Sequence, residues 1–354
     1  MKYHHMQFTH TFRANYGIVI DPIFERHLTP AGHPEKPSRI TALLQALENW
    51  NAPGPVTRVV PQRAQEEWIL AVHAARHFEA VRETSGVDHR RLDADTSTSA
   101  DSFDVAMAAA GSVIALLEGM GRGDLEGGFA LVRPPGHHAQ RDRIMGFCLF
   151  NNVAVAAQWA IDTKMARKVA VVDFDVHHGN GTQEIFYARS DVLYLSTHQY
   201  PFYPGTGHFS ETGSGAGEHF TVNFPLQAGT GDHFYCTLFE EPAAAVLRRF
   251  EPELILVSAG YDAHHLDPLG GMSLTTAGFG RITNLLNQVA REVCPGRILY
   301  VLEGGYNLKA LAEAVLQTID TTLKPQSFSI PPVQEEAYRR YRRNARQWFR
   351  YWDL

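Results

Sequence analysis

The chain has 354 residues, and its 32 Lys and Arg residues against 38 Asp and Glu residues give a net charge of −6. Hydrophobic residues make up 44% and charged residues 20%, which is typical of a globular protein and excludes a disordered chain, collagen and a coiled-coil rod. The acidic balance gives no reason to expect nucleic acid as a partner. The 18 histidines favour metal or acid–base chemistry, because imidazole binds metals and titrates near neutral pH.

The cysteines bear on the compartment. Cys148, Cys236 and Cys294 are scattered and form no CxxC pair, which excludes a disulfide scaffold and a Cys-rich zinc site and fits a reducing environment. The first twenty residues lack the basic-then-apolar order of a signal peptide. Because no apolar run approaches the ~20 residues of a membrane span, we expect a cytoplasmic protein that does not bind a membrane.

Apolar, β-branched runs alternate with amphipathic stretches along the chain. Runs that are apolar on both faces and separated by helices are typical of a parallel sheet covered on both sides, so we expect one large α/β domain. The predicted elements, in chain order, are helix 38–50, helix 101–118, strand Gly128–Arg133, helix 149–163, strand Lys168–Asp173, strand Val192–Thr197, helix 233–249, strand Leu254–Ala259, helix 275–293, strand Ile298–Glu303 and helix 307–322.

Two segments differ from this pattern. Residues 199–231 are rich in Gly, Pro and Thr, which predicts a long ordered loop of the kind that carries function. The second segment, residues 331–354, has six arginines between Arg339 and Arg350. Its apolar side chains share one helical face: Tyr341, Ala345, Trp348 and Trp352.

We therefore divide the chain into a domain over residues 1–330 and a C-terminal helix over residues 331–354. We expect this helix to dock its aromatic face on the body or on a second subunit. Binding to nucleic acid or to an acidic partner is the alternative. The long 199–231 segment and the aromatic tail both offer surface for subunit contacts, so we expect a homo-oligomer.

Polar residues follow the predicted strands at their carboxyl ends, where ligands bind in an open α/β sheet. An extended chain sends Asp175 and His177 to the same side. With Asp262 from a later strand they form a candidate three-ligand metal site, which leaves an open position for water as a catalytic zinc site requires. This ligand set suits zinc and also accepts Fe(II). The alternative is that the carboxylates cap helices or pair with arginine.

A second group of residues suits acid–base chemistry. His137 and His138 follow Pro-Pro-Gly, and Asp173 is placed to accept an N–H from one of the two rings, which is how a carboxylate orients a general base. Tyr306 follows Gly-Gly, where its hydroxyl is available to donate to a developing oxyanion. Structural histidines and an aromatic plug are the alternatives. Metal, imidazole and hydroxyl together indicate metal-assisted hydrolysis of an acyl carbonyl.

Six motifs identify a family resemblance: RPPGHHA, GFCLFNNVAVAA, VDFDVHHGNGTQ, YPGTGH, SAGYDAH and LEGGYN. In this order and spacing the chain resembles the zinc-dependent histone deacetylase superfamily, which includes acetoin-utilisation proteins and acetylpolyamine amidohydrolases. The resemblance runs from about His33 to about residue 322. It implies an arginase/deacetylase-type fold with a central eight-stranded parallel sheet and helices on both faces.

The resemblance also implies roles for the residues named above. Asp175, His177 and Asp262 would be zinc ligands. His138 would be the general base that activates the metal-bound water and then the acid for the leaving amine, and Tyr306 would stabilise the oxyanion. His137, paired with Asp173, would chiefly be an electrostatic stabiliser.

Further positions follow from the resemblance alone. Phe147 and Tyr203 would wall a narrow channel for an acyl-lysine stem, and Asp95 would clamp the substrate backbone at the rim. The substrate site would also include Gly146, Gly304 and Leu269. A structural monovalent cation, potassium in this superfamily, would bind beside Asp173, Asp175, His177, Ser196 and Thr197.

Three positions indicate the subgroup. Asn180 stands where class I enzymes have aspartate, so the chain looks like class II and its bacterial relatives. Tyr306 is not the histidine of the weakly active type. Leu269 occupies the place of a glutamate gatekeeper in polyamine-selective relatives, and an apolar side chain cannot pair with a distant ammonium.

The sequence thus predicts a zinc-dependent amidohydrolase that removes acetyl from lysine side chains and releases acetate. A deacetylase of small acetylated amines such as acetylpolyamines is the first alternative. The others are a non-catalytic acyl-lysine binder and a two-metal ureohydrolase, although the latter would need carboxylates that bridge two metals.

Overall fold

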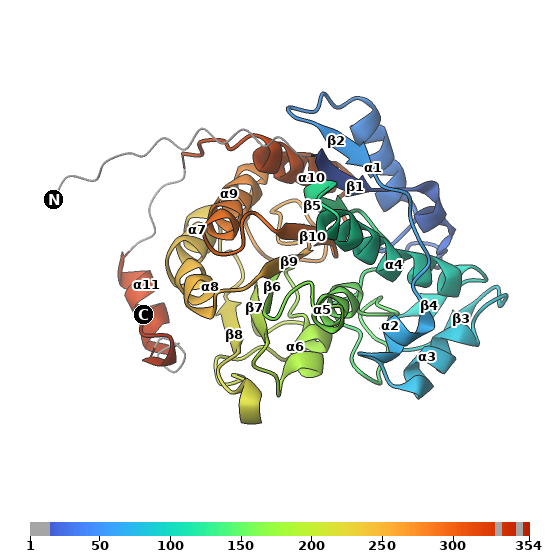
Figure 1. Cartoon of the computed structure of the whole chain (residues 1–354), viewed down its shortest axis with the longest axis horizontal. Coiled ribbons are helices and arrows are strands. Elements are labelled where there is room, and N and C mark those ends of the chain that lie inside the picture. The colour runs from blue at the N-terminus through green and yellow to red at the C-terminus, as the bar shows by residue number, and fades with distance from the viewer. Residues whose placement is uncertain (1–14, 330–334, 345–349) are drawn as a thin grey trace.

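The computed structural model describes residues 15–329, 335–344 and 350–354. Eight parallel strands form the central sheet in the order β2-β1-β5-β10-β9-β6-β7-β8, which confirms the predicted architecture (Figure 1). The strands of this sheet are β1 Asn15–Val19, β2 Val56–Arg58, β5 Leu125–Ala130, β6 Val169–Asp173, β7 Val192–Gln199, β8 Thr221–Leu226, β9 Leu254–Ala259 and β10 Ile298–Leu302.

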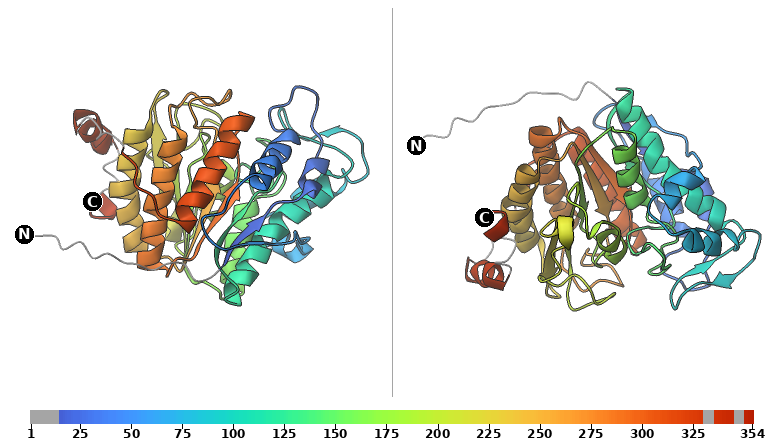
Figure 2. Two further views of the ribbon diagram at one scale, coloured as in Figure 1. Left: turned by 90° about the horizontal axis from the view of Figure 1, so that it is seen from above. Right: turned by 60° about the horizontal axis from the view of Figure 1, so that its bottom comes forward.

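Helices cover both faces of this sheet (Figure 2). On one face α1, α10, α9 and α8 pack in a row, and on the other α4 packs on α5 and α5 on α6. A short hairpin of β3 Arg90–Arg91 and β4 Ser97–Thr98 lies outside the main sheet. The helices are α1 Ser38–Glu48, α2 Glu66–Leu70, α3 Ala75–Arg82, α4 Ser102–Gly121, α5 Asn152–Asp162, α6 Asn180–Phe186, α7 Asp232–Leu238, α8 Ala244–Phe250, α9 Thr276–Val293, α10 Leu308–Leu323 and α11 Glu335–Asn344.

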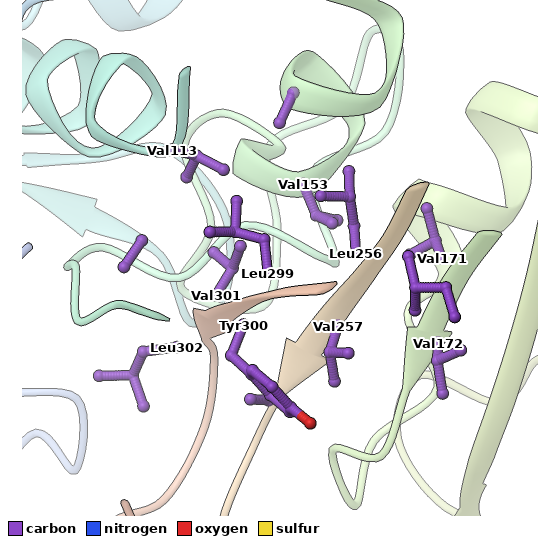
Figure 3. Packing of buried hydrophobic residues seen from close by; sticks show 14 of the residues in the cluster. Val113, Val153, Val171, Val172, Leu256, Val257, Leu299, Tyr300, Val301 and Leu302 are labelled. Carbon is purple, nitrogen blue, oxygen red and sulfur yellow. The ribbon is translucent and has the colours of Figure 1, made fainter. Parts of the chain in front are cut away.

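The central strands are buried on both faces. In Figure 3, Leu256 and Leu299 point toward Val113 of α4 and Val153 of α5, whereas Tyr300 points to the opposite face. Every residue of β6, β9 and β10 is buried. A strand alternates its side chains between faces, so burial of all of them requires helices on both sides. This explains why these strands read as continuous apolar runs.

Several predicted boundaries were wrong. Residues 199–231 are not all loop, because they contain β8, the edge strand of the sheet. Pro225 lies within β8, and a proline argues against a strand in the sequence pattern. An edge strand tolerates one because one side of its hydrogen-bond ladder is unpaired. The predicted strand Gly128–Arg133 begins earlier and ends at Ala130. The predicted helix 233–249 is α7 and α8 joined by a π-helical turn around Pro242, which cannot donate the helical hydrogen bond.

The described part of the C-terminal tail packs on the body. The Tyr341 ring of α11 meets Phe209 at 5.2 Å and Phe234 at 5.3 Å between centroids. Trp352 packs edge-on against Phe220. A groove of about 460 Å³ lies between α11, α7 and the 200–230 segment. Ala345 and Trp348 lie outside the described residues, and the division at residue 330 stays a prediction.

Helix α4 departs from one expectation. Its length and apolar composition suffice for a membrane span, contrary to the prediction that no stretch approaches one. However, 83% of its apolar window is buried inside the protein, where it packs on β5, β1 and α5. Its composition is therefore accounted for by its place in the core.

Candidate active site

The turns after the central strands converge on a cavity of about 130 Å³. The turn after β5 supplies the histidine pair, the turn after β6 supplies His177, and the turn after β10 supplies Tyr306. Convergence at the carboxyl end of a parallel sheet follows from strand polarity. The cavity is lined by Asp95, Pro135, His137, His138, Gly146, Phe147, His177, Tyr203, Leu269, Gly304 and Tyr306. All of these except Pro135 are predicted site residues.

Three predicted metal ligands meet beside this cavity. The ligand atoms of Asp175, His177 and Asp262 lie within 4.8 Å of one another. His177 Nδ1 is 3.1 Å from Asp175 Oδ1 and 3.2 Å from Asp262 Oδ2. The turn is built by its own side chains, since Asp173 Oδ1 accepts the Asp175 N–H and Asp175 Oδ1 accepts the His177 N–H.

The chemistry of this cluster fits a divalent cation. Both carboxylates are buried, and burial together with the nearby Asp175 raises the pKa of Asp262. Asp262 Oδ2 accepts no hydrogen bond from the residues that the structure describes. Buried carboxylates side by side are costly unless a cation or proton offsets their charge. Two carboxylates and one imidazole with an open side form a ligand set that zinc accepts.

Close approach by glycine makes room for the cluster. The N–H of Gly304 donates to Asp175 Oδ2 at 2.8 Å. A Cβ at Gly304 would lie 2.0 Å from Asp262 Oδ2. Any side chain at this position would displace the carboxylates, so Gly304 is a packing requirement of the site.

The two neighbouring histidines have different partners. His137 Nδ1 lies 3.0 Å from Asp173 Oδ2. Burial opposes a charge on this ring, but the carboxylates of Asp173, Asp175 and Glu303 outweigh it and raise the pKa of His137 to about 10. The ring is therefore a buried cation at neutral pH.

His138 is held in the opposite state. Burial, followed by the neighbouring rings of His137 and His177, lowers the pKa of His138 well below its usual range. Its Nδ1 lies 2.8 Å from Asn180 Oδ1. The amide oxygen accepts the Nδ1–H of the neutral ring, which leaves a lone pair on Nε2. A neutral imidazole in a cavity suits a general base.

Tyr306 lines the same cavity. Burial and the nearby Asp262 raise the pKa of the Tyr306 phenol, so it stays protonated and remains a donor. The Arg39 guanidinium lies over its ring, 5.1 Å from the centroid. Phe147 meets the ring edge-on at 6.0 Å.

The residues predicted to wall a substrate channel, Phe147 and Tyr203, line the cavity, as does Asp95. Tyr203 meets His138 edge-on at 5.2 Å and is 38% exposed, so it extends from His138 to solvent. Asp95 Oδ1 accepts the Gly146 N–H at 3.0 Å and the Thr96 hydroxyl at 2.8 Å. Asp95 thus anchors the loop that carries Phe147 as well as lining the cavity.

A family model described as the histone deacetylase domain matches residues 33–322. The chain belongs to the histone deacetylase family. The match has the extent that the motifs predicted.

Known relatives agree in sequence and in structure. Histone deacetylase 10, chloroplastic, of Oryza sativa subsp. japonica is 39% identical over 314 residues, which cover 84% of this chain and 71% of that protein. A probable deacetylase of Archaeoglobus fulgidus is 38% identical over 298 residues, covering 83% and 82%. The crystal structure of the HDA15 HD domain matches with a TM-score of 0.89 and 35% identity, covering 96% of this chain and 97% of that one. The chain is therefore a hydrolytic deacetylase with the arginase/deacetylase-type fold.

The residues predicted to hold a monovalent cation lie at the end of β6, in the turn after it and on the adjacent β7. Asp173 pairs in register with Ser196. Thr197 Oγ1 is 3.5 Å from the Asp173 carbonyl oxygen, and Ser196 Oγ is 2.9 Å from His198 Nδ1. The cation itself stays a prediction.

Sequence reasoning missed three residues of this deacetylase site. Phe202 stacks on the His177 ring at 5.4 Å. Glu303 Oε2 accepts the backbone N–H groups of Gly136 and His137. Asp267 accepts the backbone N–H of Tyr306. The two carboxylates stand inside LEGGYN and DPLGG, but their effect passes through the backbone, which a side-chain motif does not reveal.

Proposed function

We propose that this deacetylase removes acetyl groups from N-acetyl-lysine side chains and releases acetate. The observation that carries the proposal is one cavity lined by a neutral imidazole, a protonated phenol and aromatic side chains, with a candidate metal cluster beside it. This combination supplies a base, an oxyanion donor and a metal position for amide hydrolysis.

Asp175, His177 and Asp262 would hold the metal, which we propose to be Zn²⁺, with Fe²⁺ as the alternative for the same ligand set. When bound, such an ion acts as a Lewis acid toward a carbonyl oxygen and lowers the pKa of water. A potassium ion beside Asp173, Ser196 and Thr197 belongs to the same proposal.

His138 handles the proton in this mechanism. Its neutral Nε2 takes the proton of the attacking water, and the resulting N–H then protonates the leaving lysine amine. The His137 ring, whose pKa the carboxylates around it raise, lies next to it, with ring centroids 4.1 Å apart. The positive charge of this ring favours negative charge developing on the substrate and keeps His138 a weak base that releases its proton readily.

Tyr306 acts on the carbonyl. Its hydroxyl donates a hydrogen bond to the carbonyl oxygen, and the bond strengthens as that oxygen becomes negative. Arg39 over the ring and Phe147 at its edge hold the phenol in place. Phe147 and Tyr203 meanwhile exclude water from the aliphatic stem of the substrate.

The channel mouth favours acetyl-lysine over a small acetylated amine. Leu269 lines the cavity and offers no charge for a distant ammonium. One observation favours a small acetylated amine as substrate: the carboxylate of Asp95 lines the same cavity and could pair with an ammonium group. However, Asp95 Oδ1 is already used by the loop that carries Phe147, so we keep the small-amine reaction as the second candidate.

The test is acetate release by the metal-loaded protein from an acetyl-lysine peptide and from N-acetylputrescine under matched conditions. We expect a higher kcat/KM for the peptide, and we expect Leu269→Glu to shift the preference toward the polyamine. Preference for N-acetylputrescine in the wild type would contradict the substrate assignment and keep the deacetylase chemistry. Turnover of neither compound would contradict the proposed function.

A further inference from the structure

The carboxylate of Asp267 joins the channel rim to the turn that carries Tyr306. Its Oδ2 accepts the backbone N–H of Tyr306 at 2.6 Å and that of Asn307 at 3.1 Å. Its Oδ1 accepts the backbone N–H of Leu269 at 3.0 Å. Asp267 is buried and is absent from the cavity lining. Any influence it has on the reaction therefore passes through the residues that it holds.

The turn before Tyr306 needs such an anchor. Gly304 and Gly305 precede the tyrosine, and Gly305 has a φ of +117°. Two consecutive glycines leave the backbone many alternatives, so the position of the next residue depends on external contacts. Arg39 Nε supplies one such contact by donating to the Gly305 carbonyl at 2.8 Å. Asp267 holds the next residue directly, by accepting the Tyr306 N–H.

We propose that Asp267 is a positioning residue that sets the Tyr306 hydroxyl and the Leu269 side chain relative to each other. The inference rests on the proposed function, because it takes Tyr306 as the oxyanion donor. An oxyanion donor works only at the place where the charge develops, and a misplacement of about 1 Å costs on the order of 10²-fold in rate. The Asp267 carboxylate thereby couples the position of Leu269, which lines the cavity, to the position of the Tyr306 hydroxyl.

Aspartate suits this position because both of its carboxylate oxygens accept backbone hydrogen bonds. A carboxylate has two acceptor oxygens, and here one serves Leu269 while the other serves Tyr306 and Asn307. An asparagine has one acceptor oxygen and an NH₂ group that repels a facing N–H. In Asp267→Asn the oxygen is best placed on the side with two donors, so this variant releases Leu269 and keeps Tyr306. Asp267→Ala releases both.

The experiment is a double-mutant cycle that combines Asp267→Ala with Tyr306→Phe. Steady-state kinetics give kcat and KM for the acetyl-lysine peptide. For variants that turn over slowly, the single-turnover rate replaces kcat. We expect Asp267→Ala to lower kcat by about 10- to 100-fold. In the Tyr306→Phe background the same change should cost much less, because the hydroxyl that it misplaces is already gone. Asp267→Asn should raise KM more than it lowers kcat, and it covers the case in which the alanine variant does not fold.

A matched control is Asp232→Asn. The Asp232 carboxylate also anchors a loop, by accepting the Thr275 N–H and the Thr275 hydroxyl, and it lies outside the cavity lining. We expect its effect on kcat to be small and equal in both backgrounds. Bound metal per chain should be unchanged in every Asp267 variant.

The outcomes separate the two proposals. Equal losses from Asp267→Ala in the Tyr306 and Tyr306→Phe backgrounds would overturn the positioning role and leave the proposed function intact. Loss of metal from the Asp267 variants would do the same. Full turnover by Tyr306→Phe would instead remove the oxyanion role on which both depend.

Discussion

At the scale of single residues, the site is built by giving identical side chains different neighbours. His137 and His138 are adjacent, yet carboxylates raise the pKa of His137 to about 10 while burial and neighbouring imidazoles lower that of His138. Such a separation is how a protein assigns acid–base roles to similar groups. The two rings also differ in the group that faces Nδ1, which is the Asp173 carboxylate for His137 and the Asn180 amide oxygen for His138.

The Asn180→Asp variant tests this assignment. A carboxylate on Nδ1 favours the charged ring, so the pKa of His138 should rise. His138 must be neutral to take a proton, so activity is lost as the pH falls through that pKa. The acidic limb of the kcat/KM profile should therefore move to higher pH in the variant. An unchanged acidic limb would contradict His138 as the base; wild-type profiles at two ionic strengths serve as the control.

Replacing the phenol of Tyr306 tests the oxyanion donor. Tyr306→Phe removes one hydrogen-bond donor, and losses of this kind reduce turnover by about 10²–10³-fold. The metal should stay bound, since the ligand atoms belong to other residues. Turnover and metal content measured on the same sample check both statements. A variant that loses metal in step with activity would show a structural role for Tyr306.

The sequence predicted the side chains of the site better than their supports. Residues such as His138 and Tyr306 stand in motifs because their own atoms meet the substrate cavity. Glu303 and Asp267 instead hold backbone N–H groups of their neighbours. Many residue types and many positions can accept a backbone N–H, so spacing alone does not identify such partners.

At the scale of elements, strand prediction succeeded where burial on two faces left continuous apolar runs. β9 occupies the predicted residues Leu254–Ala259, and β10 ends one residue before the predicted end. Three strands of the central sheet were missed: β1, which lies inside the sheet, and the edge strands β2 and β8, which are short or contain proline. No residue of β2 is buried, so its pattern is weak, whereas β8 is buried throughout and was missed because of Pro225.

The loop that carries Phe147 provides an element-scale prediction. Gly146 has a φ of +61°, and a Cβ there would lie 2.3 Å from Cδ2 of His138. Gly146→Ala should therefore displace His138 and lower kcat/KM by about 10-fold or more, because the base must keep its geometry. Enzyme kinetics and thermal unfolding on the same variant check the result.

Gly86→Ala is the matched control for this loop. Gly86 also has a positive φ, +75°, but a Cβ there would meet none of the described atoms within 4 Å. Gly86→Ala therefore has the strain of a positive φ but no steric clash, and this strain costs about 1 kcal/mol of folding stability. If both variants lose the same activity, the close approach of Gly146 to His138 has no catalytic role.

At the scale of the whole molecule, the candidate metal cluster forms only in the folded sheet. Asp175 and His177 follow β6, whereas Asp262 follows β9, and these strands are neighbours in the sheet although about 80 residues separate them in the chain. An unfolded chain does not bring the three ligands together. Metal binding should therefore stabilise the fold as well as supply chemistry.

Metal removal tests this coupling. A ligand present at 100 times its Kd stabilises the native state by about 2.7 kcal/mol if it does not bind the unfolded chain. Removal should lower the Tm, since the empty cluster keeps the repulsion between two buried carboxylates. Thermal unfolding with chelator and after zinc is restored measures the effect. Asp262→Asn keeps the shape of the site but removes one charged ligand, so its Tm should respond little to either treatment. An equal response in that variant would place the stabilising metal elsewhere and contradict Asp262 as a ligand.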